Sequence, residues 1–182
     1  MYFQYQSTFA LQVNVFGLSS AVYGALISVN GLVIIFLELP LTAITRRLPT
    51  RRVIAAGMFL VALGLALTAF AYTIPLLALT VFIWTLGEIV ESPVSNAYIA
   101  NLAPAHLRGR YQGAYGLVWS IGLILAPLLG TLVFSWSHQG LWLLCGVLGT
   151  LAALLVLLSG NKRRRPTPPP PKDEPTSLVS VS

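Results

Sequence analysis

The sequence predicts an all-α, polytopic membrane protein: a bundle of transmembrane helices. Hydrophobic residues make up 56% of the chain and charged residues 9%, whereas soluble domains carry about 25% charged residues. Five apolar runs are long enough to cross a bilayer, and the alternating pattern of a membrane β-barrel is absent. The basic residues lie between these runs, a pattern of membrane orientation rather than of nucleic-acid binding.

The apolar runs indicate five complete spans and one partial span. A helix needs roughly 20 apolar residues to cross about 30 Å of hydrocarbon. Residues 1–13 are apolar and aromatic, but at about 1.5 Å per residue they reach only about 20 Å. We expect them to be the outer end of a helix whose beginning is missing. The complete spans are expected at residues 19–45, 53–72, 75–102, 111–136 and 140–159.

Basic residues predict the orientation of the bundle. All 11 lysine and arginine residues lie in the loop after the first complete span, in the loop after the third, or in the C-terminal tail. The positive-inside rule therefore places these segments and the C-terminus in the cytoplasm. We expect the chain in a cell membrane, inner or plasma, with the rings of Trp136, His138 and Trp142 at the outer interface.

Composition divides the chain into two regions. Residues 1–160 form the expected transmembrane domain. Residues 161–182 begin with a basic cluster, continue with a run of prolines and have little apolar surface to bury. We expect this second region to be a disordered, partly polyproline cytoplasmic tail. The single cysteine, Cys145, lies in an apolar run and is expected to be a packing residue.

Three of the five acidic residues, Glu38, Glu88 and Glu91, lie within predicted spans. An intramembrane carboxylate costs about 2.5–3.5 kcal/mol on insertion scales, so it normally faces a cavity, a partner or a proton path. Around two of them, spacings of three and four residues produce one polar helix face. This face consists of Thr85, Glu88, Ser92 and Ser95, with Glu91 and Asn96 at its edges. We expect a water-filled cavity there; the alternative is protonated carboxylates that only pack.

The first complete span has a thinner polar stripe. Tyr23, Asn30 and Glu38 fall within roughly an 80° arc of this helix. Glu38 lies about two turns before Arg46, at the cytoplasmic end. Two interpretations of Glu38 stay open: a gating ion pair with the loop arginines, or a simple interfacial carboxylate.

Small residues recur every four positions in the span at 111–136. They are Gly122, Ala126 and Gly130. Such a face permits two helices to approach closely, so we expect close helix packing along it.

Four motifs give the chain a resemblance to a known family. They are Glu38-Leu-Pro40 before an arginine-rich loop, Gly87-Glu88 with Pro93, the Arg108–Gly113 segment Arg-Gly-Arg-Tyr-Gln-Gly, and the Ala-Pro span between Gly122 and Gly130. With these motifs, roughly residues 1–160 resemble the C-terminal half of a major facilitator superfamily transporter of the bacterial multidrug or small-solute efflux type. The resemblance implies half of a twelve-span fold, truncated at its N-terminus.

The resemblance also implies a function and a set of site residues. The function is secondary transport, namely proton-coupled efflux of small organic compounds, without enzymatic chemistry, cofactor or metal. The implied partners are the lipid bilayer, a small-molecule substrate, the proton, and a complementary N-terminal half or a second copy. The implied residues are Glu88 and Glu91 for proton or cation coupling; Tyr23, Asn30, Ser92, Asn96, Tyr115 and Trp119 for the substrate cavity; and Glu38, Arg46, Arg108 and Arg110 for the cytoplasmic gate.

Two rival functions stay open. One is a non-transporting membrane fragment or interaction protein, such as a gene remnant. The other is a membrane enzyme or metal permease that uses Glu88-x-x-Glu91 as a cation site. Metal sites of that kind usually need histidine or further carboxylates nearby, and His106 and His138 lie in loops expected on opposite sides of the membrane.

Overall fold

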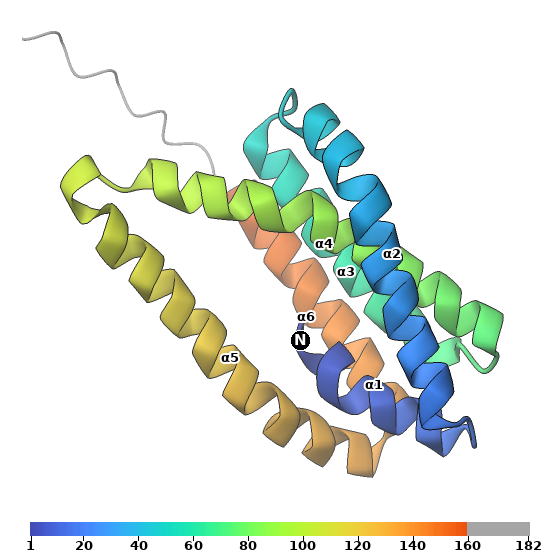
Figure 1. The fold of residues 1–182 in the computed structure, drawn as a ribbon. Coiled ribbons are helices and arrows are strands. Elements are labelled where there is room, and N and C mark those ends of the chain that lie inside the picture. Colours follow the sequence, from blue (N-terminus) through green and yellow to red (C-terminus); the bar gives the residue numbers. More distant parts are fainter. Residues whose placement is uncertain (160–182) are drawn as a thin grey trace, which may run out of the picture.

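The computed structural model describes residues 1–159, and this part of the chain is a bundle of helices (Figure 1). In chain order the elements are α1 (Gln4–Val15), α2 (Ser20–Thr45), α3 (Thr50–Leu67), the 3-10 helix η1 (Thr68–Phe70), α4 (Ile74–Leu102), the 3-10 helix η2 (Ala105–Leu107), α5 (Arg108–Trp136) and α6 (His138–Leu158). Five segments are long and apolar enough to cross a membrane: α2, α3 together with η1, α4, α5 and α6. The predicted all-α transmembrane bundle is confirmed. The predicted tail at 161–182 lies outside the described residues.

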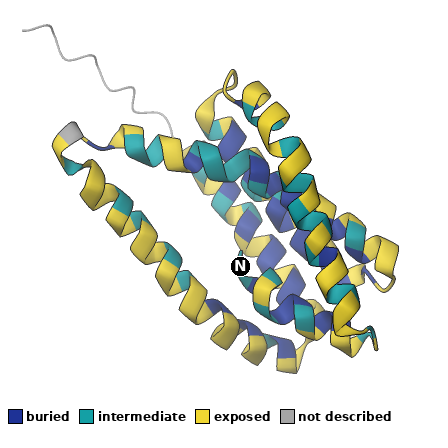
Figure 2. Cartoon of the chain, viewed as in Figure 1, coloured by how far each residue is buried: buried dark blue, intermediate teal, exposed yellow. Residues whose placement is uncertain are grey.

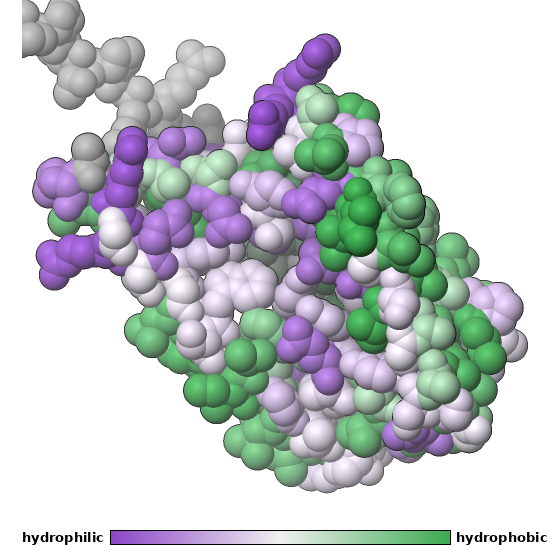
Figure 3. All heavy atoms as spheres, in the orientation of Figure 1, coloured by the Kyte–Doolittle hydropathy of each residue, from purple (hydrophilic) through white to green (hydrophobic). Residues whose placement is uncertain are grey.

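Charge is segregated to one end of the bundle. The arginine-bearing connection after α2 lies at the same end as the connection between α4 and α5, and the other connections lie at the opposite end (Figure 1). Hydrophilic residues gather at this arginine-bearing end, whereas apolar residues cover much of the rest of the visible face (Figure 3). Arg108 and Arg110 belong to the first turn of α5 rather than to the loop before it.

Helix α3 is the centre of the bundle, packed between α4 and α6. Glycines make the contact between α3 and α4 unusually close. A Cβ added to Gly87 would lie 2.6 Å from the Gly57 carbonyl oxygen, and one added to Gly64 would lie 2.6 Å from the backbone nitrogen of Trp84. A Cβ on Gly57 would lie 2.6 Å from the Cβ of Glu91. The two helices therefore touch backbone to backbone, as small residues permit in membranes.

Helices α2 and α5 lie at the edges of the bundle and are mostly exposed (Figure 2). Within residues 1–159, α2 buries Leu26 and Thr45, and α5 buries Ala126, Gly130 and Phe134. Large apolar side chains cover the outward faces of both helices. Such faces are stable only in lipid or against another protein surface.

A glycine turn joins α1 to α2. The Gly17 N–H donates to the Asn14 carbonyl at 2.9 Å, and the Leu18 N–H donates to the Val13 carbonyl at 3.1 Å. These two bonds form a Schellman motif, which satisfies carbonyls at the end of α1. The motif requires a positive φ, and Gly17 has a φ of 72°, which costs glycine little.

Three polar residues on one face of α1 point into the bundle. Gln4, Thr8 and Gln12 are spaced by four residues, and all three are buried. The Gln4 Nε2 donates to the Ala126 carbonyl of α5 at 2.9 Å, and the Trp142 Nε1 of α6 donates to the Gln12 Oε1 at 3.0 Å. The Trp142 ring, expected at the outer interface, is buried inside the bundle, where Gln12 provides the partner that a buried indole N–H needs. Its depth in the membrane stays a prediction.

The small residues of α5 provide space for the N-terminal segment. A Cβ on Gly130 would overlap the Gln4 side chain, and one on Gly122 would lie 3.3 Å from the Phe3 ring. The predicted close packing along this face therefore occurs, and its partner is the segment that contains α1.

Candidate functional site

Glu88 is the central residue of α4 and faces the N-terminal segment and α2. The Asn30 Nδ2 of α2 lies 2.9 Å from the Thr85 Oγ1 and 3.4 Å from the Glu88 Oε2, and donates to both. The Thr85 hydroxyl donates in turn to the Val81 carbonyl at 2.6 Å. The Tyr2 hydroxyl donates to the Glu88 Oε1. Each carboxylate oxygen of Glu88 thus accepts a hydrogen bond from a neutral donor on another segment.

An aromatic group adjoins Glu88 and connects it to α5. The Trp119 ring lies 5.1 Å from the Tyr2 ring and 5.3 Å from the Phe3 ring, in edge-on contacts. Tyr115 precedes Trp119 by one turn of α5, and the two ring centres lie 6.1 Å apart. Edge-to-face pairs at these distances are favourable. Tyr2 therefore contacts both the carboxylate on α4 and the aromatic surface of α5.

Glu91 contacts a different set of helices. It accepts a hydrogen bond from the Ser95 hydroxyl and lines a cavity of about 280 Å³ between α3, α4, α5 and α6. The polar residues that line this cavity are Arg51, Glu91, Ser95, Tyr98, Tyr115 and Ser159. Because Glu88 faces α2 and the N-terminal segment, the two carboxylates do not converge on one cation site in this structure.

The remaining expected cavity residues lie apart from this group. The Tyr23 ring lies 6.1 Å from that of Phe9, about two turns of α2 from Asn30 towards the end opposite the arginines. Ser92 is half-buried on α4, and Asn96 is exposed. Of the six expected cavity residues, Asn30 bonds directly to Glu88, and Trp119 and Tyr115 are connected to it through the Tyr2 ring. The role of all six stays a prediction.

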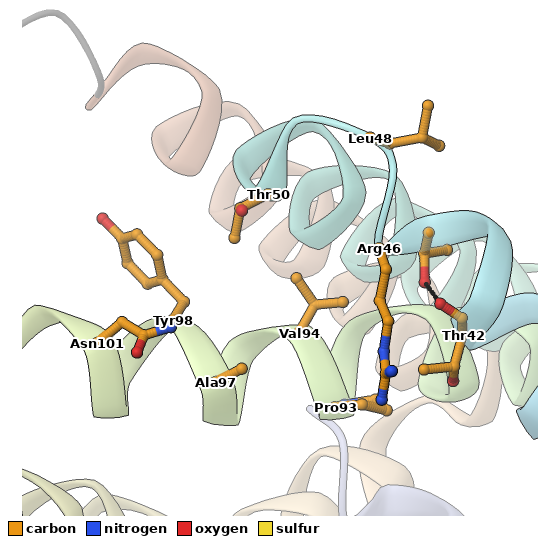
Figure 4. A pocket seen from close by; sticks show the side chains of 10 residues that line it. Thr42, Arg46, Leu48, Thr50, Pro93, Val94, Ala97, Tyr98 and Asn101 are labelled. Atoms are coloured by element: carbon orange, nitrogen blue, oxygen red, sulfur yellow. Dashed lines mark hydrogen bonds between the residues drawn. The ribbon is translucent and has the colours of Figure 1, made fainter.

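The four expected gate residues are exposed, with Arg46, Arg108 and Arg110 at the arginine-bearing end. Arg46 extends from the end of α2 across α4, where its guanidinium lies beside Pro93 (Figure 4). It lines a cavity of about 370 Å³ between α2, the start of α3 and the second half of α4. The gating role of these residues stays a prediction.

Sequence reasoning missed Tyr2, the donor to Glu88. The segment 1–13 reads as apolar and aromatic, so its hydroxyl groups attract no attention. A signal was nevertheless present, because Gln4, Thr8 and Gln12 recur every four residues in this segment. Such a stripe predicts that the helix carrying it is surrounded by protein rather than by lipid.

A family model decides the identity of the chain. The model of the Major Facilitator Superfamily matches residues 2–182. The chain belongs to the Major Facilitator Superfamily. It is therefore a transporter-family protein rather than an enzyme, with a multi-pass membrane fold.

Several curated proteins that are similar to this chain are also named as transporters or as resistance proteins. The "Uncharacterized MFS-type transporter YqjV" of Bacillus subtilis (strain 168) is 24% identical over 71% of this major facilitator chain. The "Na(+), Li(+), K(+)/H(+) antiporter" of Planococcus maritimus is 26% identical over 58%, and the "Multidrug resistance protein MdtH" of Aeromonas salmonicida (strain A449) is 28% identical over 56%. The matched segments cover 32%, 25% and 27% of these relatives, so the chain spans about a third of their length or less.

Proposed function

We propose that this major facilitator chain takes part in proton-coupled efflux of small organic compounds, with Glu88 as the proton-binding group. The observation that supports this is the position of Glu88 at the centre of a membrane-length helix, half-buried and bonded to two neutral donors. A carboxylate in such a place is costly and normally serves a proton or ion path. Two relatives named for antiport and multidrug resistance agree with this proposal.

Proton uptake by Glu88 would change its hydrogen bonds. As a carboxylate, it accepts from the Tyr2 hydroxyl and from the Asn30 amide. As a carboxylic acid, it has a proton of its own to donate, and a tyrosine hydroxyl can turn from donor to acceptor. The Tyr2 ring contacts Trp119. A change in the hydrogen bond between Glu88 and Tyr2 would therefore alter the contact of the Tyr2 ring with Trp119 on α5. This contact would link proton binding to the position of that helix.

The aromatic group suggests the class of substrate. Tyr2, Phe3 and Trp119 form one aromatic group beside Glu88, and Tyr115 connects this group to the cavity that Glu91 lines. Ligand sites are mostly apolar with a few placed polar groups, and this composition suits small, largely apolar compounds. Glu91, in its separate cavity, is proposed as a secondary proton or cation group.

Transport by this family fold is proposed to need a second half. Alternating access requires two helix bundles that rock around a central site. The exposed apolar faces of α2 and α5 leave room for such a bundle, either a complementary N-terminal half or a second copy of this chain. We expect the monomeric chain alone not to move substrate against a gradient.

The protein is proposed to lie in the inner or plasma membrane of the cell, with the basic end of the bundle facing the cytoplasm. All 11 lysines and arginines lie on segments expected on that side. A reporter that is active only outside the cytoplasm, fused after Ser182, should stay silent. A bright signal from this fusion would refute the orientation.

Glu88→Gln tests the proton role, because it keeps size and hydrogen bonding but removes the proton. The bundle, paired with its complementary half or a second copy, is placed in liposomes with an imposed pH gradient and a fluorescent substrate. We expect Glu88→Gln to lose accumulation driven by the gradient but to keep substrate exchange at equal pH. Asp173→Asn, which removes a carboxylate outside the predicted transmembrane domain, is the control and should keep both.

The variant Glu91→Gln should have a milder effect than Glu88→Gln, because Glu91 lies outside the group around Tyr2. Normal gradient-driven accumulation by Glu88→Gln would make Glu88 a packing residue and would end the proposal. Absence of any substrate exchange in the unaltered paired bundle would instead favour a non-transporting interaction protein.

A further inference from the structure

The cavity that Glu91 lines carries one charge of each sign. It has a volume of about 280 Å³ between α3, α4, α5 and α6, close to the lower limit of small-molecule sites. Arg51, in the first turn of α3, lines the same cavity. The structure of residues 1–159 contains no ion pair between Arg51 and Glu91. The two opposite charges therefore face one cavity without neutralising each other.

The second carboxylate oxygen of Glu91 is open to this cavity. The Ser95 hydroxyl donates to Oε1, and Oε2 accepts no hydrogen bond within residues 1–159. The unpartnered polar side-chain atoms that protein encloses completely in this part of the chain are the Thr42 hydroxyl and the Trp84 Nε1. Oε2 of Glu91 is not one of them. Because this oxygen is unpaired but not enclosed, a ligand in the cavity can reach it.

The two charges are displaced from each other along the bundle. A Cβ on Gly57 would lie 2.6 Å from the Cβ of Glu91, so these two residues lie at the same level of α3 and α4. Arg51 precedes Gly57 by six residues, which corresponds to about 9 Å of helix rise. A ligand that matches both Arg51 and Glu91 must therefore carry its own charges well apart.

The lining between the two charges is apolar and aromatic. Tyr98 of α4 and Tyr115 of α5 contribute rings, and aromatic ring faces attract cations. The apolar lining residues are Ile54, Met58, Ile99 and Val156. Helix α5 diverges from α6 towards the arginine-bearing end (Figure 1), so contact between these two helices does not seal the cavity there. The lining therefore suits a short hydrocarbon chain that enters between polar ends.

We propose that this cavity binds a small amphoteric compound, with an ammonium group at one end of a short apolar chain and a carboxylate at the other. The ammonium group donates to the Glu91 carboxylate, and the ligand carboxylate accepts from the Arg51 guanidinium. Such charge-assisted hydrogen bonds are stronger than those between neutral groups. The proposal assigns a ligand to the Glu91 cavity and does not depend on proton binding by Glu88.

The pair of charges distinguishes this ligand from a simple amine or a simple acid. An amine would match Glu91 and leave Arg51 without a partner, and an acid would do the reverse. A partly buried charge that stays unpaired when a ligand excludes water is costly. A site with placed polar groups therefore rejects an analogue that lacks one of the matching groups.

Equilibrium binding to the full chain in nanodiscs, without any gradient, tests the proposal separately from transport. The radiolabelled probe is ε-aminocaproate, and the competitors are hexylamine, hexanoate and norleucine. Hexylamine and hexanoate each lack one charge, and norleucine is an isomer whose charges are adjacent. We expect each competitor to bind about tenfold more weakly than the probe, the usual value of one hydrogen bond to a charged group.

The variants assign each charge of the ligand to its residue. Glu91→Gln should weaken binding of ε-aminocaproate and of hexylamine about tenfold and leave hexanoate unchanged. Arg51→Gln should weaken ε-aminocaproate and hexanoate and leave hexylamine unchanged. This division by ligand would not result from a variant that only damages the fold. Arg52→Gln, an exposed neighbour that does not line the cavity, is the matched control and should change binding about twofold or less.

Three outcomes would overturn the proposal. Hexylamine that binds as tightly as ε-aminocaproate would reduce the cavity to a simple cation site. Norleucine that binds as tightly would show that the separation of Arg51 and Glu91 is not recognised. Equal losses in Arg51→Gln and Arg52→Gln would show diffuse charge attraction instead of a site.

Discussion

The contact between α3 and α4 differs in kind from the contacts of α2 and α5. At Gly57, Gly64 and Gly87, an added Cβ would meet atoms of the facing helix at 2.6 Å. At Gly31 of α2 and Gly116 of α5, nothing lies within 4 Å of an added Cβ. The first pair of helices is fitted backbone to backbone at glycines. Helix α2 packs on α4 without such glycine contacts, and α5 packs more sparsely on α1 and α6.

This difference explains where the candidate site lies. Glu88 and Thr85 are on α4, which α3 holds in place through glycine contacts. Asn30 approaches them from α2, and Trp119 approaches from α5 through Tyr2. The carboxylate thus lies on the helix with the closest backbone packing, and its partners lie on more exposed helices. This arrangement suits the proposed proton role of Glu88, because an ion-binding group can stay in place while the surrounding helices rearrange.

The comparison predicts the largest stability loss at the α3–α4 contact. Gly87→Ala should lower the free energy of unfolding by about 3 kcal/mol, because backbone atoms of α3 would have to shift. Gly31→Ala is the matched control and should not lower it, because the position is open and alanine favours helix. Unfolding in SDS titrations measures both. Equal losses in the two variants would remove the distinction between the helices.

The second prediction concerns the exposed faces of α2 and α5, which a second bundle would cover. Spin labels at Ile35 of α2 and Ile124 of α5, both 71% exposed, should become several-fold less accessible to oxygen when a second bundle binds. A label at Leu155 of α6, which is 67% exposed, should stay accessible. Electron paramagnetic resonance in liposomes measures the change. Protection of Leu155 instead of the other two would place the partner on the wrong face for the proposed pairing.

The smallest expected effect concerns the hydrogen bond that joins α2 to α4. Asn30→Ala should lower the free energy of unfolding by about 0.6 kcal/mol, the average for such bonds in membranes. A double-mutant cycle with Thr85→Val should assign most of this loss to the Asn30–Thr85 contact. A loss near that of Gly87→Ala would mean that α2 is held as firmly as α3.

Much of the fold could be predicted because the membrane sets its rules. Long apolar runs must be helices, since each buried backbone N–H needs a partner within its own segment. The internal packing was harder to predict. Trp142 looks like an interfacial ring in the sequence, but its orientation depends on Gln12, which is 130 residues away. Likewise, Gly57 and Gly64 have no local signal that distinguishes them from the open Gly31.

The candidate site could be predicted in part. Residue spacing alone puts Glu88 and Thr85 on one face of α4, and the composition of the span marks that face as costly in lipid. Spacing cannot tell which helix covers which edge of that face. Glu91 lies three residues from Glu88, yet it lines a different cavity because α3 approaches that edge through Gly57. The place of Tyr2 in the candidate site follows only from its hydrogen bond to Glu88 in the structure.

The polar stripe of α1 has a consequence for the order in which the bundle is assembled. Gln4 and Gln12 find their hydrogen-bond partners on α5 and α6, which the ribosome completes more than a hundred residues later. Until then these amides would be unpaired in hydrocarbon, where an unsatisfied polar group is costly. The contacts of this segment with α5 and α6 therefore form late, after both of those helices have been inserted.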